Sequence, residues 1–152
     1  MKVGDVAPNF IIKDQNGKEF ELYKNLDKNL LMVFYPKDNT VVCSAQLAEY
    51  NESYDEFTQN GINVVGINTD SVQSHLNFCD KLKLKFPLLA DEDKKVSKQF
   101  NAINFLGMNK RFLVLISTNK RILWTESTLP VTYIKAGEIL EKVKSLSLKE
   151  MT

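Results

Sequence analysis

Two spacings of apolar residues, one typical of buried strands and one typical of helices, alternate along the first half of the chain. Continuous apolar runs at residues 30–35 and 62–67 predict two buried strands. Between them, apolar residues three or four positions apart over residues 43–59 predict a helix, and Gly61 is expected to end it. A strand, a helix and a second strand in this order predict two parallel strands joined by a crossover.

The rest of the chain continues these patterns. Residues 8–23 predict a β-hairpin, because the turn signal at residues 14–17 separates two apolar segments. Residues 86–89 predict a short edge strand, since Pro87 cannot donate a hydrogen bond to a neighbouring strand. Four further elements are expected. The first is a helix that Asp70 or Ser71 caps, and one stripe of it carries Val72, Leu76, Cys79 and Leu82. A short helix at 91–100, with Val96 and Phe100 inward, and a hairpin of strands 112–116 and 121–126 follow, and the chain is expected to close with a C-terminal helix marked by Ala136, Ile139, Leu140, Val143 and Leu146.

This order of elements predicts an α/β protein with a mixed sheet, an N-terminal hairpin and helices on both faces of the sheet. Its 152 residues contain no linker or repeat, which predicts a single domain over residues 1–152. The net charge of +1 gives no drive toward nucleic acid or an anionic membrane. The absence of a long apolar stretch and of a signal-peptide pattern predicts a cytoplasmic protein.

Cysteine and histidine limit the chemistry that is available. Cys43 is expected in the first turn of a helix, where free backbone N–H groups and the helix dipole favour a thiolate. The other cysteine is Cys79, and in a reducing cytoplasm a pair is expected to be transient and catalytic rather than structural. Two cysteines and the single His75 cannot supply a zinc site, so no metal is expected. His75 itself is expected on the surface of its helix.

The stretch around Cys43 resembles a known active-site signature. Pro36, Thr40 and Cys43 have the spacing found in the peroxiredoxins, the thiol peroxidases of the thioredoxin superfamily. The segment Phe34–Thr40 is most similar to the bacterioferritin-comigratory-protein branch of that family. Two further segments also resemble the family, Val3–Phe10 as its usual opening and Arg111–Ile116 as its arginine-bearing strand. The resemblance therefore runs from residue 3 to about residue 126 and implies a thioredoxin-like fold.

The resemblance also implies a role for each matching residue. Cys43 would attack a hydroperoxide as a thiolate, and Arg111 would stabilise the thiolate and bind the peroxide oxygens. Thr40 would orient the peroxide through its hydroxyl, and Pro36 would shape the pocket. The expected substrates are hydrogen peroxide and small organic hydroperoxides, and the expected reductant is thioredoxin or a similar dithiol. No organic cofactor is expected, and the protein is expected to be a monomer or weak homodimer.

Cys79 is the candidate resolving cysteine. One subgroup of the branch carries its resolving cysteine in the second helix at a similar spacing, whereas another carries it at the position that Ala48 occupies here. The resemblance therefore implies an intramolecular disulfide between Cys43 and Cys79, formed after Cys43 becomes a sulfenic acid. The alternative is that Cys79 is a small apolar residue that only fills space beside Val72 and Leu76.

The chain departs from the family pattern at two places. Val41 and Val42 precede the nucleophile where the family usually has glycine, often after proline, and Gln46 replaces the usual glutamate. These changes bear on the rate and the substrate preference rather than on the reaction class. Two other functions stay open: a thiol redox sensor that passes its disulfide to a partner, and a binding module with an unreactive Cys43.

Overall fold

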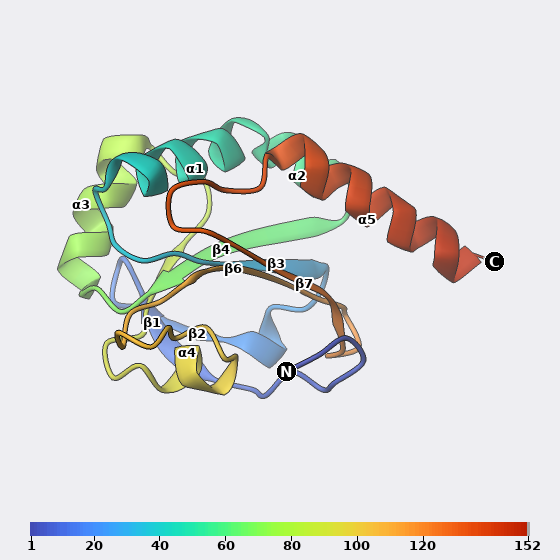
Figure 1. The fold of residues 1–152 in the computed structure, drawn as a ribbon, viewed down its shortest axis with the longest axis horizontal. Coiled ribbons are helices and arrows are strands. Elements are labelled where there is room, and N and C mark those ends of the chain that lie inside the picture. Colours follow the sequence, from blue (N-terminus) through green and yellow to red (C-terminus); the bar gives the residue numbers. More distant parts are fainter. Residues whose placement is uncertain (152) are drawn as a thin grey trace.

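One mixed sheet forms the centre of the molecule (Figure 1). The computed structural model describes the backbone of residues 1–151 and the side chains of residues 1–147. Within this part, seven strands follow the order β2-β1-β5-β4-β3-β6-β7, with β3, β4 and β5 parallel and the other neighbours antiparallel. The elements are β1 (Ile11–Asp14), β2 (Glu19–Glu21), a 3-10 turn (Leu22–Lys24), β3 (Asn29–Phe34), α1 (Val41–Glu52), α2 (Tyr54–Gln59), β4 (Ile62–Asn68), α3 (Val72–Leu82), β5 (Leu88–Ala90), α4 (Lys95–Gln99), β6 (Arg111–Ile116), β7 (Ile122–Thr128) and α5 (Ala136–Met151).

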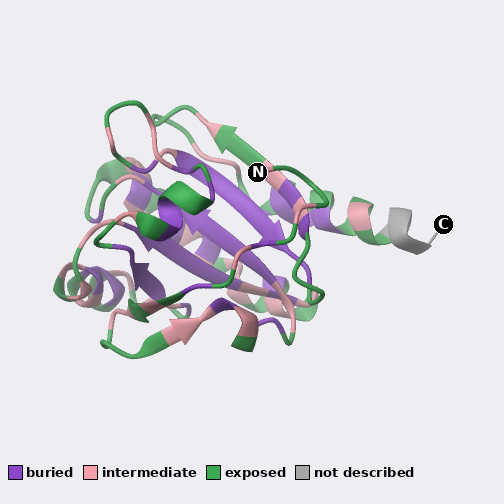
Figure 2. Cartoon of the chain, turned by 90° about the horizontal axis from the view of Figure 1, so that it is seen from below, coloured by how far each residue is buried: buried purple, intermediate pink, exposed green. Residues whose placement is uncertain are grey.

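The sheet divides the interior into two hydrophobic cores. In β3, Leu31 and Val33 face the core beneath α1, α2, α3 and α5, while Leu30, Met32 and Phe34 face the core beneath α4 and the N-terminal segment. This alternation follows from the two-residue period of a strand, and both faces are apolar because both are covered. Figure 2 shows the resulting buried strands through the middle of the molecule, with exposed loops around them. The predicted α/β class and thioredoxin-like fold are confirmed.

The prediction of an edge strand around Pro87 was wrong. β5 lies inside the sheet, where it pairs in parallel with β4 and antiparallel with β1. Pro87 precedes the strand, so its missing N–H interrupts no ladder, and its carbonyl accepts a hydrogen bond from the N–H of Gly66 at 3.0 Å. The N-terminal hairpin covers β5 and leaves β2 and β7 as the edges. Pairing between strands that lie far apart in the sequence produces no local sequence pattern from which the position of β5 could be predicted.

The predicted helix over residues 43–59 is two helices. α1 ends at Glu52, and α2 begins at Tyr54 after a non-helical Ser53. With this break Tyr50 and Phe57 are both fully buried and meet edge to face at 6.2 Å. Gly61 follows α2 with a φ of 73°, as expected of a glycine that ends a helix.

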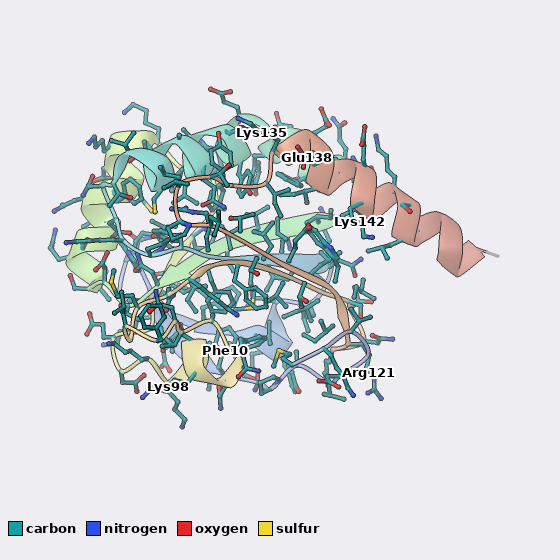
Figure 3. All side chains as sticks on the ribbon, in the orientation of Figure 1. Phe10, Lys98, Arg121, Lys135, Glu138 and Lys142 are labelled. Carbon is teal, nitrogen blue, oxygen red and sulfur yellow. The ribbon has the colours of Figure 1, made fainter. Side chains whose placement is uncertain are left out.

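The predicted short helix over residues 91–100 is confined to α4. The carboxylate of Asp91 accepts hydrogen bonds from the N–H groups of Val96 and Ser97, so it holds the start of α4 from outside the helix. Val96 and Phe100 are buried as predicted. Phe100 meets Phe10 edge to face at 6.1 Å. Figure 3 labels Phe10 on the side of the sheet where α4 lies.

The C-terminal helix is attached to α1 through Glu49. One carboxylate oxygen of Glu49 accepts from the N–H of Ala136 at 2.7 Å, and the other accepts from the hydroxyl of Tyr133 at 2.7 Å. Lys135 adds an ion pair to the same carboxylate at 3.6 Å, next to the N-terminal end of α5 (Figure 3). No described helix combines the length and apolarity that a bilayer crossing requires. The predicted domain extends one residue past the described backbone and stays a prediction.

Candidate active site

Cys43 is the third residue of α1 and is fully buried. Strand β3 ends at Phe34, and a loop leads to Thr40, which precedes α1 with an extended backbone (φ −80°, ψ 156°). The first N–H groups of a helix have no intrahelical acceptor and carry the positive end of its dipole. The thiol of Cys43 therefore lies where a negative charge on sulfur is stabilised.

Arg111 lies beside this thiol although 68 residues separate the two in the chain. It is the first residue of β6, and the antiparallel pairing of Phe34 with Phe112 brings it level with the end of β3. Its Nη2 donates to the Sγ of Cys43 at 3.3 Å and to the carbonyl of Pro130 at 3.1 Å. The side chain is only 4% exposed, so its charge acts on the sulfur with little screening by solvent.

Gln46 fixes the other arm of the guanidinium. Its Oε1 accepts from Nη1 of Arg111 at 2.5 Å, and its Nε2 donates to the hydroxyl of Tyr50 at 3.2 Å. Tyr50 in turn donates to the carbonyl of Ile134 at 2.6 Å, and burial raises the pKa of its phenol. The hydrogen bonds are therefore donated in one direction, from Arg111 to Gln46 and from Gln46 to Tyr50, which sets the orientation of the Gln46 amide. The one signal in the sequence for this role of Tyr50 is its spacing of four residues from Gln46, which places the two side chains on one face of the helix.

Thr40 and Pro36 lie on the approach to the thiol. The hydroxyl of Thr40 is exposed and donates to the carbonyl of Lys37 at 3.3 Å, and no hydrogen bond in the described part of the chain joins it to Cys43. The carbonyl of Thr40 accepts from the N–H of Ser44 at 2.9 Å and so starts the hydrogen bonding of α1. Pro36 is partly buried and, with Arg111, lines a hollow beside the site.

This hollow has a volume of about 390 Å³ and a mainly apolar wall. One side is the segment before β6, where Phe105 and Leu106 are 96% and 70% exposed. Thr128 and Pro130, at the end of β7 and just after it, also line the hollow. The hollow can hold an apolar group next to the guanidinium of Arg111.

Cys79 lies in the second half of α3, buried in the same core as Cys43. Both cysteines are free. Burial, with smaller contributions from the charges of Asp38 and Asp80, raises the pKa of the Cys79 thiol to about 12. The thiol is therefore neutral and covered in this state.

The prediction of His75 as a surface residue was wrong. The imidazole is fully buried between Asp38 and the carbonyl of Leu89, at 2.7 Å and 3.0 Å from its two ring nitrogens. The buried stripe of α3 contains His75, Phe78 and Cys79, whereas Val72 and Leu76 are only half-buried. Within the described residues, no three of the His, Cys, Asp and Glu side chains lie together as metal ligands would.

Comparison with known proteins finds a matching family and several similar relatives. The model of the AhpC/TSA family matches residues 3–125. Peroxiredoxin Q, chloroplastic, from Triticum aestivum is 41% identical over 97 residues, which are 64% of this chain and 45% of the wheat sequence. A putative peroxiredoxin bcp from Helicobacter pylori is 38% identical over 102 residues, 67% of each chain. The chain thus matches about half the length of its plant relatives.

Solved structures extend the similarity over nearly the whole chain. A mutant of PrxQ from Xylella fastidiosa is 30% identical with a TM-score of 0.88, covering 97% of this chain and 98% of its own. Peroxidoxin BcpB from Mycobacterium tuberculosis is 26% identical with a TM-score of 0.84, covering 97% of each chain. The chain belongs to the AhpC/TSA family of peroxiredoxins, in the branch of the peroxiredoxin Q and bcp proteins.

Proposed function

We propose that this protein is a thiol peroxidase that reduces hydrogen peroxide and small organic hydroperoxides. The observation that carries the proposal is the 3.3 Å contact between the guanidinium of Arg111 and the sulfur of Cys43 at the start of α1. A thiolate is the nucleophile, and both the helix N-terminus and the guanidinium favour it. The membership in the peroxiredoxins supports the same reaction class.

The first step would be attack of the Cys43 thiolate on the terminal oxygen of the hydroperoxide. A sulfur–oxygen bond forms, the oxygen–oxygen bond breaks, and the leaving oxygen takes a proton to become water or an alcohol. Arg111 would stabilise the negative charge that develops on that oxygen, and Gln46 would hold the guanidinium in position. Thr40 and Pro36 would orient the peroxide, with Thr40 turning its exposed hydroxyl from Lys37 to the substrate.

The second step would join Cys43 to Cys79. The sulfur of Cys79 attacks the Cys43 sulfenic acid, a disulfide forms, and the hydroxyl leaves as water with the thiol proton. Thioredoxin or a similar dithiol would then reduce this disulfide and would itself be oxidised to a disulfide. The burial of Cys79 means that this step waits for a local opening of α3.

The hollow beside Arg111 supports organic hydroperoxides as substrates. Its apolar wall between Pro36 and Pro130 offers an alkyl group a place out of water while the peroxide oxygens face the guanidinium. We therefore expect cumene hydroperoxide to react at a rate at least comparable to hydrogen peroxide. Competition of the two substrates in one stopped-flow experiment measures this preference.

A thiol redox sensor is the second candidate function, and the covered state of Cys79 favours it. If α3 opens slowly, the sulfenic acid on Cys43 persists and a thiol of a partner protein can reach it first. Turnover separates the two functions. A peroxidase consumes many equivalents of peroxide in the presence of thioredoxin alone, while a sensor stalls until its partner is added.

The decisive experiment is consumption of NADPH in the presence of peroxide, thioredoxin and thioredoxin reductase. Cys43→Ser should lower the rate at least about a thousandfold, because a hydroxyl is a far poorer nucleophile than a thiolate at neutral pH. Substantial turnover by this variant would remove Cys43 from the mechanism. The wild type with heat-inactivated thioredoxin is the control for direct oxidation of NADPH.

A further inference from the structure

A buried polar network lies under the active-site loop, and the peroxide chemistry makes no use of it. Its centre is Asp38, two residues before Thr40 and 5% exposed. The carboxylate accepts four hydrogen bonds from the ends of β3 and β4 and from α3: Tyr35 Oη at 2.6 Å, Asn68 Nδ2 at 3.2 Å, Ser74 Oγ at 2.7 Å and His75 Nδ1 at 2.7 Å. The loop that carries Pro36 and Thr40 is therefore tied to α3 through one carboxylate.

Both ring nitrogens of His75 face acceptors. Nδ1 lies 2.7 Å from the Asp38 carboxylate, and Nε2 lies 3.0 Å from the carbonyl of Leu89. A carbonyl oxygen can only accept, and a carboxylate that already accepts from Ser74 does the same. Both ring nitrogens donate at once when the ring carries two N–H groups, as an imidazolium does. In that form His75 and Asp38 are a buried ion pair that joins α3 to the loop on one side and to β5 on the other.

The groups around the pair agree with these charges. Burial alone would raise the pKa of Asp38, but the hydrogen bond and charge of His75, with the bonds from Tyr35 and Ser74, hold that pKa below its ordinary value. Burial and the charge of Asp38 raise the pKa of Tyr35, which stays a donor. Asp70, two residues after the end of β4, accepts from the N–H of Asp38 at 2.8 Å and from Nδ2 of Asn68 at 3.2 Å, and so belongs to the same network.

The two halves of α3 are held differently. The first half has the buried pair, the cap that Ser71 places on the N–H of Ser74 at 3.1 Å, and the bond from the N–H of Val72 to Glu92. The second half carries Cys79 and ends at Lys83, which has a left-handed φ of 54°. Beyond the helix, Nδ2 of Asn51 donates to the carbonyl of Lys83 and Oδ1 of Asn51 accepts from the N–H of Lys85, both at exposed positions. The backbone of Leu88 also forms a hydrogen bond with the sulfur of Cys79.

We propose that the Asp38–His75 ion pair is a positioning pair that keeps the first half of α3 on the active-site loop throughout the cycle, so that only the half with Cys79 unwinds to form the disulfide. This proposal rests on the proposed function. Its consequence is that Cys79 moves on a short tether anchored at His75, four residues away, close to the sulfenic acid. The loop keeps Pro36 and Thr40 in place for the next peroxide.

His75 is the single histidine of the chain, so its nitrogen NMR spectrum reports this pair alone. With 15N-labelled histidine at neutral pH, both ring nitrogens should show the shifts and the attached protons of an imidazolium. The same signature should persist after one equivalent of peroxide has formed the disulfide. Asp38→Asn is the matched variant, and it should leave a neutral ring. A neutral ring in the reduced wild type, or a loss of the imidazolium on oxidation, would overturn the proposal.

Two conservative variants separate the two bonds of the ring. His75→Asn places an amide donor near the position of Nδ1 and can keep the bond to Asp38, while His75→Gln reaches toward Leu89 and loses that bond. Hydrogen exchange of the amides of residues 73–76 should stay close to wild type in His75→Asn and become at least about tenfold faster in His75→Gln. Oxidation of Cys43 should slow severalfold only in His75→Gln, because its loop is less well positioned.

Equal exchange and equal oxidation in the two variants would contradict a specific role of the bond to Asp38. In the oxidised wild type, amides of residues 79–85 should lose protection while those of residues 73–76 keep it. Loss of protection along all of α3 would also contradict the proposal. If peroxide does not oxidise Cys43 at all, the proposed function fails. The nitrogen NMR spectrum and the hydrogen exchange of the reduced protein still decide whether the Asp38–His75 ion pair holds the first half of α3.

Discussion

At the scale of single residues, the guanidinium of Arg111 is shared among three acceptors from different parts of the chain. Its Nη atoms donate to Cys43, Gln46 and Pro130, and its buried Nε finds no acceptor among the described residues. A rigid planar fork held in this way keeps its charge at a fixed place near the sulfur. Under the proposed mechanism, this charge would need no rearrangement when negative charge develops on the leaving oxygen.

Arg111→Met should slow the first oxidation of Cys43 at least about a hundredfold, the scale of losing a preorganised electrostatic group. Arg111→Lys should recover only part of this rate, since an ammonium keeps the charge but cannot hold Gln46 and Pro130 at once. Stopped-flow mixing with peroxide measures both. An unchanged rate in Arg111→Met would place this arginine outside the chemistry.

Thr40 tests whether a hydroxyl takes part in binding the peroxide. Thr40→Ser should keep most of the oxidation rate, and Thr40→Val, which has nearly the shape of threonine, should lose most of it. The helix start should survive in both, because the carbonyl rather than the side chain of Thr40 begins α1. Equal rates in the two variants would mean that the residue acts only through its shape.

At the scale of elements, α3 carries the buried thiol of Cys79, the candidate resolving cysteine. Cys79 is 7% exposed, and its pKa of about 12 keeps it protonated while the helix is closed. Under the proposed function, the reaction of Cys79 would depend on opening α3, whereas the first oxidation of Cys43 would not. The two steps should therefore respond to different variants.

Cys79→Ser should leave the first oxidation of Cys43 within about twofold of wild type, because Cys79 acts only after attack. Recycling by thioredoxin should fail while dithiothreitol still reduces the sulfenic acid. Over-oxidation to sulfinic acid should increase, because the competing exit is absent. Peptide mass spectrometry without reductant should find the Cys43–Cys79 disulfide in the oxidised wild type. A free Cys79 in that sample would exclude internal resolution.

At the scale of the whole molecule, the core beneath α1, α2, α3 and α5 holds three weakly acidic groups in their neutral form. Burial raises the pKa of Tyr35, of Tyr50 and of Cys79, and the helices that cover this face of the sheet are what bury them. Such a group is neutral when protonated, so its contribution to stability is complete below its pKa in the unfolded chain and is lost as pH rises toward its pKa in the folded protein. Stability should therefore fall in alkaline solution.

For Cys79 the loss of stability should begin near pH 9, because the ordinary pKa of the thiol is 9.0, and continue to about pH 12, its pKa in the folded protein. In this range the free energy of unfolding of the wild type should fall more steeply than that of Cys79→Ala, by up to about 1.4 kcal/mol for each pH unit. Urea unfolding in reductant at pH 8, 9.5 and 11 gives both slopes. Parallel curves would show that Cys79 ionises equally in the folded and unfolded chains.

Local patterns determined much of the fold and of the candidate site. The apolar runs of β3 and β4 and Gly61 after α2 act over a few residues, and these predictions were confirmed. The helical periodicity over residues 43–59 was confirmed as helix but missed the break at Ser53. The spacing of Pro36, Thr40 and Cys43 likewise needs no distant contact to be read. The roles of these residues, the reductant and the cytoplasmic location stay predictions.

Only the tertiary structure decided which distant groups meet. The antiparallel pairing of β3 with β6 places Arg111 on Cys43, and the hairpin makes β5 internal. His75 is the clearest case, because a single polar residue on a helix has no local signal that distinguishes solvent from a buried carboxylate. Its place depends on Asp38, 37 residues away, and on the carbonyl of Leu89. A charged or polar group can be buried without a large loss of stability only where hydrogen-bonding or oppositely charged partners surround it, and the tertiary fold brings those partners together.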